Sequence, residues 1–157
     1  MITYEEILQI IAGFVGAFGF AILFNVRGRK MIGAILGGLF SWGLFVLLKF
    51  VSDGEALRYF IVAFVISLYS ELLARHLKTP AGTFLMTALI PLIPGGSLYY
   101  TMSAVFAGDV QHFTTKAIGT LSLAAALALG IVLASALTKV VRNVLHHLAQ
   151  KKKEASA

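Results

Sequence analysis

Long apolar runs separated by short polar stretches dominate the chain. A helix needs about 20 consecutive apolar residues to cross the hydrocarbon core of a bilayer. Five runs approach or exceed this length: residues 7–24, 31–51, 56–74, 79–107 and 117–141. Hydrophobic residues make up 59% of the chain and charged residues only 13%, about half the charged share of a soluble domain. The pattern predicts an all-α, polytopic integral membrane protein with about five transmembrane helices and one transmembrane domain, residues 1–141.

The fourth run differs from the others because it contains strong helix breakers. Pro91 and Pro94 are followed directly by Gly95 and Gly96. Proline lacks an N–H donor and disfavours helical angles in the residue before it, and glycine admits backbone conformations that other residues avoid. We therefore expect a broken helix, with an inner half from Pro80 to about residue 90 and an outer half that starts near residue 97.

A break of this kind would create a polar backbone site inside an apolar segment. Irregular backbone at membrane depth is tolerated only where it is buried in protein or lines a water-filled cavity. In transporters, the N-terminus of a half-helix often presents free N–H groups to an anion. This interpretation makes Ser97 the N-cap of the outer half, and places a substrate carboxylate at Ser97 and the N–H groups of Gly95 and Gly96, with Pro91 and Pro94 holding the break open. The alternative is a kinked helix that binds nothing.

The distribution of lysine and arginine predicts the orientation of the spans. The chain has a net charge of +6, carried in short clusters between apolar runs, which is typical of membrane protein loops and not of a nucleic-acid-binding face. Cytoplasmic loops are enriched in these residues, so we expect the N-terminus outside and the C-terminus in the cytoplasm. Only Arg58 and Lys116 fall in loops on the outer side, and Lys49 lies near the outer end of its own run. The basic residues of the inner side are Arg27, Arg29, Lys30, Arg75, Lys78, Lys139, Arg142, Lys151, Lys152 and Lys153.

The last segment, residues 142–157, combines helical periodicity with a basic end. Val144 and Leu148 are four residues apart, and lysines fill positions 151–153. Such a segment suits a short cytoplasmic amphipathic helix on an anionic membrane surface. A solvated helix end that only enforces topology is the alternative.

Two further polar residues lie at the ends of spans. Glu71 is one turn before the end of the third run, with Arg75 at i+4. It is either half of a structural ion pair or a snorkelling side chain, or it is a candidate for proton coupling or substrate gating. Asn25 ends the first run, where it is either a helix cap or a substrate contact.

Small residues recur at short spacings, mostly of three or four residues, along the runs. This pattern lets helix backbones approach closely, either within the chain or at a partner interface. The residues are Gly13, Gly16 and Gly19, then Gly33, Gly37 and Ser41, and finally Ala124, Ala128 and Gly130.

The sequence lacks the residue types, or the spacings between them, that catalytic sites and metal sites require. There is no cysteine, and the four histidines show no ligand spacing. No paired-carboxylate, Ser/His/Asp or phosphate-loop arrangement occurs. We expect neither an enzyme nor a bound metal or cofactor.

Residues 73–102 carry a resemblance to a known family. The stretch "LARHLKTPAGTFLMTALIPLIPGGSLYYTM" resembles the threonine/serine exporter (ThrE) family, in particular its small YjjB-like subunit. The first run, which ends in F-N-V, is also similar, although Arg27 stands where some members have proline. The matching positions in the stretch are Pro80, Pro91, Leu92, Pro94, Gly95 and Tyr99.

This resemblance implies a small membrane subunit of a two-component exporter in a bacterial cytoplasmic (inner) membrane. Its partner would be a larger YjjP-like subunit, and its substrate a small amino acid, such as threonine or serine, or a carboxylate such as succinate. The resemblance adds Tyr99 to the candidate substrate-binding residues, and we expect proton-coupled antiport. A pore-forming channel subunit and a non-transporting scaffold subunit are the alternatives.

Overall fold

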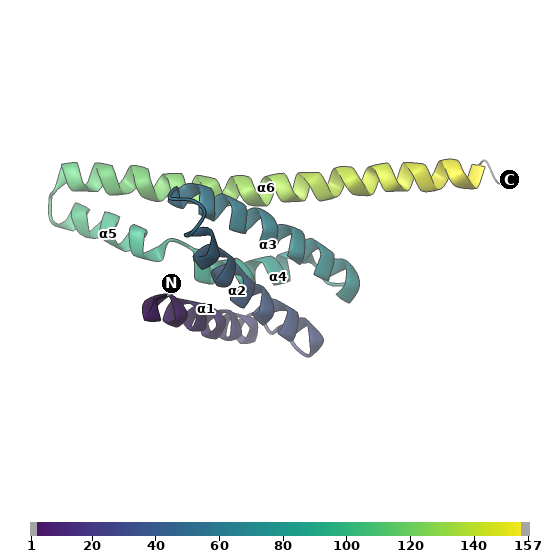
Figure 1. Cartoon of the computed structure of the whole chain (residues 1–157), viewed down its shortest axis with the longest axis horizontal. Helices are drawn as coiled ribbons and strands as arrows, with labels where there is room; N and C mark the ends of the chain where they lie inside the picture. The colour runs from purple at the N-terminus through teal and green to yellow at the C-terminus, as the bar shows by residue number, and fades with distance from the viewer. Residues whose placement is uncertain (1–2, 155–157) are drawn as a thin grey trace.

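The computed structural model describes residues 3–154, which form helices joined by short loops (Figure 1). Within this range no strand is present, and four helices are long and apolar enough to cross a membrane, or five if the bent pair α4–α5 counts as one span. The expected all-α membrane fold with a broken fourth helix is therefore confirmed. The elements are α1 (Tyr4–Leu23), α2 (Arg29–Leu48), α3 (Glu55–Leu77), α4 (Ala81–Leu89), the 3₁₀ helix η1 (Ile90–Leu92), α5 (Gly95–Phe106) and α6 (Val110–Glu154).

Close packing of α1 on α2 depends on the small residues of both helices. A Cβ added to Gly13 would collide with the ring of Trp42, and one added to Gly38 would collide with Ala17. In lipid, packing of this kind drives helix association, because burial of apolar surface offers little advantage there. A Lys49–Glu6 ion pair, with 2.8 Å between Nζ and Oε1, joins the same two helices at one end.

The same small-residue pattern serves other helix pairs inside the chain. Gly33 faces Leu73 of α3, and Gly130 of α6 lies against the backbone of α3. Gly19 has open space around it. Most of the predicted close approaches are therefore intramolecular.

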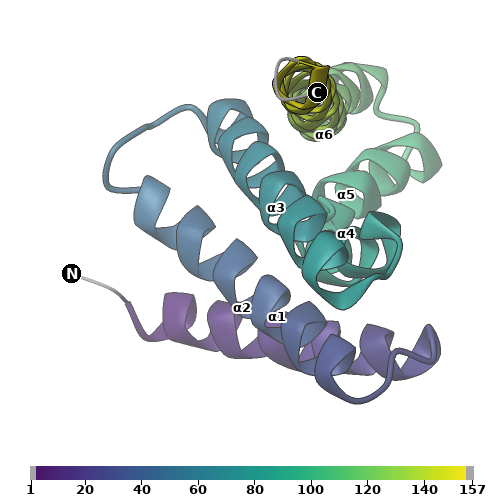
Figure 2. The same cartoon turned by 90° about the vertical axis from the view of Figure 1, so that its right-hand side faces the viewer.

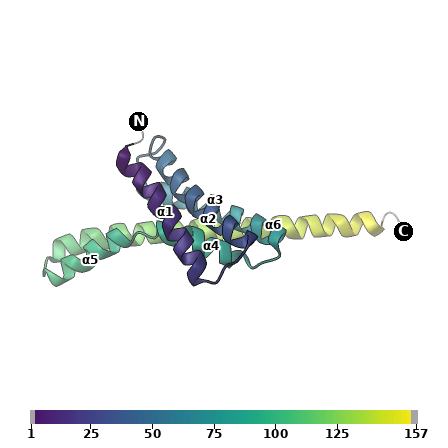
Figure 3. The same cartoon turned by 90° about the horizontal axis from the view of Figure 1, so that it is seen from below.

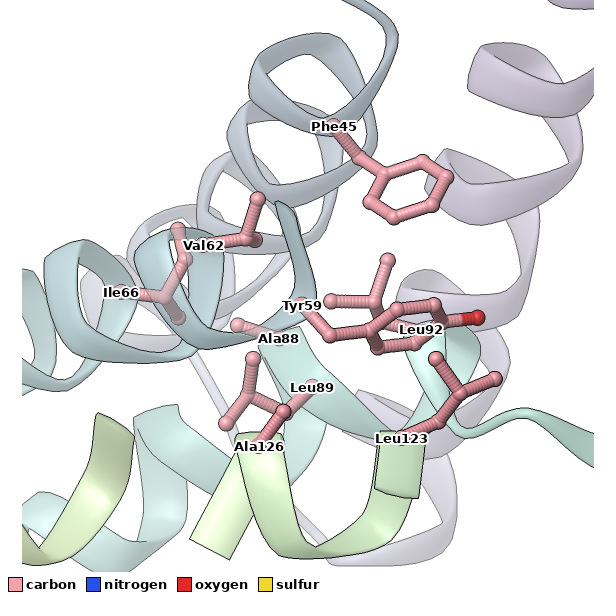
Figure 4. Packing of buried hydrophobic residues seen from close by; sticks show 9 residues of the cluster. All are labelled: Phe45, Tyr59, Val62, Ile66, Ala88, Leu89, Leu92, Leu123 and Ala126. Carbon is pink, nitrogen blue, oxygen red and sulfur yellow. The ribbon is translucent and has the colours of Figure 1, made fainter. Parts of the chain in front are cut away.

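The main buried cluster lies where α2, α3, α4, η1 and α6 meet (Figure 4). Phe45 of α2 packs edge-on against Tyr59 of α3, with 5.0 Å between ring centroids. The cluster connects the first half of the broken span to the rest of the bundle. Its members are Phe45, Tyr59, Val62, Ile66, Ala88, Leu89, Leu92, Leu123 and Ala126.

Beyond this body, α5 and the first part of α6 form an antiparallel hairpin. The hairpin extends past α1–α4 on one side, while the end of α6 extends on the other side (Figures 1 and 3). Seen from the end, α6 lies against α3 and α5, on the far side of the bundle from α1 (Figure 2). The 45 residues of α6 correspond to a length of about 68 Å, well beyond the hydrocarbon thickness.

The end of α6 differs in one respect from the sequence prediction. Residues 142–154 continue α6 without interruption, so the amphipathic segment is not a separate helix. No proline or glycine occurs after Gly130 to end the helix, and the last residues are good helix formers. Residues 155–157 of the predicted tail lie outside the described residues.

Candidate functional site

The broken fourth span has a well-defined geometry. Helix α4 tightens into η1, and Ile93 then adopts an extended conformation with a ψ angle of 132°. Pro94 follows, and α5 starts at the next residue. The axes of the two halves differ by 54°. The predicted interruption is therefore present, and the two prolines flank the extended residue.

The start of the outer half differs from the prediction at three residues. Pro94 precedes α5 as its N-cap residue, and Ser97 lies inside the first helical turn, so Ser97 is not the N-cap. Gly95 and Gly96 open the helix and have no positive φ angle. The bend therefore needs no special glycine conformation, and the non-helical residues between the two halves are Ile93 and Pro94.

Two N–H groups at the start of α5 are free. Gly95 donates to the carbonyl of Ile93 at 2.6 Å, and Leu98 donates to that of Pro94 at 3.1 Å. Within residues 3–154, the N–H groups of Gly96 and Ser97 donate to no acceptor. Free N–H groups of a first helical turn, at the positive end of the helix dipole, attract anions.

The opposite side of the break is held by α1 and α2. The indole Nε1 of Trp42 donates to the carbonyl of Pro91 at 3.2 Å, and the Pro91 ring packs beside Gly16 of α1 at van der Waals distance. The hydrogen bond satisfies a carbonyl that lies in the irregular segment, as an apolar environment requires.

We expect Trp42→Phe to destabilise the folded protein by about 1–3 kcal/mol, because the substitution leaves the Pro91 carbonyl without its donor. Thermal unfolding in detergent, followed by circular dichroism, measures the loss. Tyr99→Phe is the control, because Tyr99 is 69% exposed and its hydroxyl makes no hydrogen bond to residues 3–154. An unchanged melting temperature for Trp42→Phe would show that this bond does not stabilise the break.

A pocket of about 370 Å³ lies beside the first turn of α5. Ser97 enters it from α5, the first residues of α3 form one wall, and the first third of α6 forms the other. Several of its side chains are polar or charged. The lining residues are Glu55, Ala56, Ser97, Thr115, Lys116, Gly119, Thr120, Ser122 and Leu123.

The pocket brings together one cation, one carboxylate and several hydroxyls. Lys116 and Glu55 are exposed, and neither belongs to an ion pair within the described part of the chain. Thr101 and Thr120 share a hydrogen bond of 3.0 Å between their hydroxyls. This bond joins α5 to α6 one helical turn after Ser97. Such a set can hold a small molecule that carries opposite charges.

Sequence reasoning identified Ser97 but not its neighbours in this pocket. The sequence indicated only that Lys116 lies in an outer loop, and it gave no reason to single out Glu55. A usable signal was present, since each residue directly precedes an apolar run and Lys116 is followed by hydroxyl residues at positions 120 and 122. Only the fold shows that the two runs start side by side.

Two other predicted substrate contacts lie apart from the pocket. Tyr99 does not line it, and its exposed ring packs edge-on against Tyr100. Asn25 follows α1 with a φ of 54°, and its side-chain oxygen accepts a hydrogen bond from Nε of Arg27 at 2.8 Å. A left-handed asparagine is typical of a helix end, so the structure favours the capping interpretation of Asn25.

Glu71 lies in a different, smaller pocket between α3 and α6, together with Arg75. Despite the favourable spacing, no Glu71–Arg75 ion pair forms within residues 3–154. The ion pair, one of the interpretations that the sequence left open, is therefore not observed. The proton-coupling role stays a prediction.

Comparison with known proteins gives one match. The family model described as "Threonine/Serine exporter, ThrE" matches residues 9–137, which cover the described helices except the first residues of α1 and the end of α6. No curated protein and no solved structure matched the chain. Members of the family are transporters, in agreement with the expectation that the chain is not an enzyme. Because the match covers most of the sequence, the chain belongs to the threonine/serine exporter family.

Proposed function

We propose that the chain is the small subunit of a two-component, proton-coupled exporter in a bacterial inner membrane, working with a larger YjjP-like subunit. Family membership supports transport, and the apolar helices support a multi-pass membrane location. The substrate is threonine, serine or a related carboxylate such as succinate. Glu71 is the candidate for proton coupling.

The pocket beside Ser97 is the proposed substrate site. Lys116 and the free N–H groups of Gly96 and Ser97 bind the substrate carboxylate, since all of them attract negative charge. Glu55 binds the ammonium group of an amino acid. Hydroxyl groups on α6 form hydrogen bonds, as donors or acceptors, with the side-chain hydroxyl of a serine or threonine substrate. The convergence of both charges with Ser97 in one pocket is the observation that carries this proposal.

The distribution of lysine and arginine along the sequence gives the proposed orientation of the chain in the membrane. The end of the bundle with Glu55 and Lys116 faces outside, so the pocket is the exit side of the pathway. If the larger subunit is also a five-span unit, the two have opposite orientations, an arrangement in which sites form between inverted repeats.

Efflux of preloaded, labelled serine and succinate tests the proposal. Cells that lack their own exporters express the chain alone or together with its larger subunit. We expect efflux only with both subunits, with saturable counterflow that an uncoupler reduces. Ohmic single-channel currents would instead identify a channel.

Single substitutions in the pocket separate the roles of the two charges. We expect Lys116→Met to lower serine and succinate efflux by roughly tenfold, because both substrates lose a partner for their carboxylate. Glu55→Gln should lower serine efflux but spare succinate, which has no ammonium group. Lys30→Met, which removes a charge outside the pocket, is the control. Equal loss of both substrates in Glu55→Gln would contradict the assigned role of Glu55.

A further inference from the structure

A second polar pocket lies between α3 and α6, at the opposite end of α3 from the proposed substrate site. It has a volume of about 150 Å³. Three of its residues are cationic and one is acidic, so it carries an excess of positive charge. The lining residues are Glu71 and Arg75 of α3, and Ser135, Thr138, Lys139 and Arg142 of α6.

The positive charge of this pocket is only partly offset by the protein. Arg75, Lys139 and Arg142 are exposed, and none of them forms an ion pair within residues 3–154. Glu71 is the single carboxylate among the lining residues. An anionic group with several oxygen acceptors would match three such donors.

The pocket also lies where the apolar parts of both helices end. Residues 59–70 of α3 and 117–138 of α6 contain no charged side chain, and the pocket follows directly after both segments. Charged and hydroxyl side chains at this boundary face the headgroup layer of a membrane. A ligand in the pocket is therefore at the depth of lipid phosphates.

An apolar surface continues from the pocket toward the middle of both helices. Leu68 and Phe64 lie one and two turns before Glu71 on its face of α3, and Ile131 and Ala128 precede Ser135 in the same way on α6. All four side chains are partly or fully exposed. A cationic pocket joined to an apolar surface suits an amphiphile, whereas a soluble anion needs only the pocket.

We propose that Arg75, Lys139 and Arg142 form a binding site for the headgroup of an anionic phospholipid, whose acyl chains lie along the exposed apolar surface between α3 and α6. The excess of cations favours a lipid with net negative charge, such as phosphatidylglycerol, over zwitterionic phosphatidylethanolamine. The phosphate binds the three cationic side chains that line the pocket. The site is independent of the proposed substrate pocket.

Delipidated full-length protein in a neutral detergent provides the test. Phosphatidylglycerol, phosphatidylethanolamine and inorganic phosphate are added separately, and the melting temperature and the lipid retained in native mass spectrometry are measured. We expect phosphatidylglycerol to raise the melting temperature at least twice as much as phosphatidylethanolamine, with no rise from phosphate. An equal effect of the two lipids would overturn the charge argument, and an equal effect of phosphate alone would show a small-anion site instead.

Variants with matched changes in charge test whether the stabilisation by phosphatidylglycerol depends on this pocket. In the double variant Lys139→Gln/Arg142→Gln, we expect phosphatidylglycerol to raise the melting temperature by at most half as much as in the wild type. The same variant should retain at least fivefold less phosphatidylglycerol in native mass spectrometry. Lys30→Gln/Lys151→Gln removes the same charge from exposed positions outside the pocket and should keep the full response. If the first double variant does not fold, Arg75→Gln on α3 serves in its place. The same response in the pocket variant and its control would mean that the lipid binds only through general surface charge, and would refute the site.

Discussion

Replacing Gly130 with alanine is expected to lower the stability of the protein by about 1–3 kcal/mol, because the position has no room for a side chain. A Cβ there would lie 2.6 Å from the carbonyl oxygen of Phe60 and 2.8 Å from Cβ of Ala63. The nearest atom belongs to the backbone of α3, so no rotamer change relieves the collision. Gly130→Leu should separate α3 from α6 and prevent stable folding.

The control lies on the same helix. Gly119 has no atom within 4 Å of an added Cβ, and alanine favours a helix over glycine by roughly 0.5–1 kcal/mol. We therefore expect Gly119→Ala to leave the melting temperature unchanged or to raise it, while Gly130→Ala lowers it. Thermal unfolding of both variants in the same detergent makes the comparison. Equal effects would show that α3 and α6 do not pack as closely as the structure describes.

Replacing both Pro91 and Pro94 with alanine is expected to abolish efflux with little change in membrane level. Both substitutions restore an N–H group and remove the clash that interrupts the helix. The extended Ile93 could then become helical, and the 54° angle between the two halves would decrease. A straighter span would carry Ser97 away from the wall formed by α6, and would dismantle the proposed substrate pocket.

Pro80→Ala is the matched control for this prediction. Pro80 precedes the first turn of α4, where proline interrupts no helix. Efflux of labelled serine with both subunits present should continue in Pro80→Ala and stop in the double variant. Normal efflux in the double variant, at wild-type membrane levels, would show that transport does not require the bend.

The sequence alone determined the parts of this protein that depend on local composition. Apolar runs of about 20 residues have few alternatives to membrane helices, because a bilayer demands internal hydrogen bonding of every backbone group. The interruption of the fourth span was equally predictable, since Pro91 and Pro94 remove donors wherever they stand. The observed break and the helix pattern follow directly from these local effects.

Tertiary structure decided which side chains meet. Ser97 appeared in the sequence as a cap, but its position in the first turn of α5 and its contact with the pocket depend on where the bend directs that helix. Lys116 and Glu55 are 61 positions apart in the numbering and reach one pocket only because α3 and α6 pack side by side. Arg75 and Lys139 are brought together at the other end of the same helix pair. Periodicity predicts each helix and its faces, but the choice of partner depends on shape complementarity at residues such as Gly130, which single-sequence patterns do not encode.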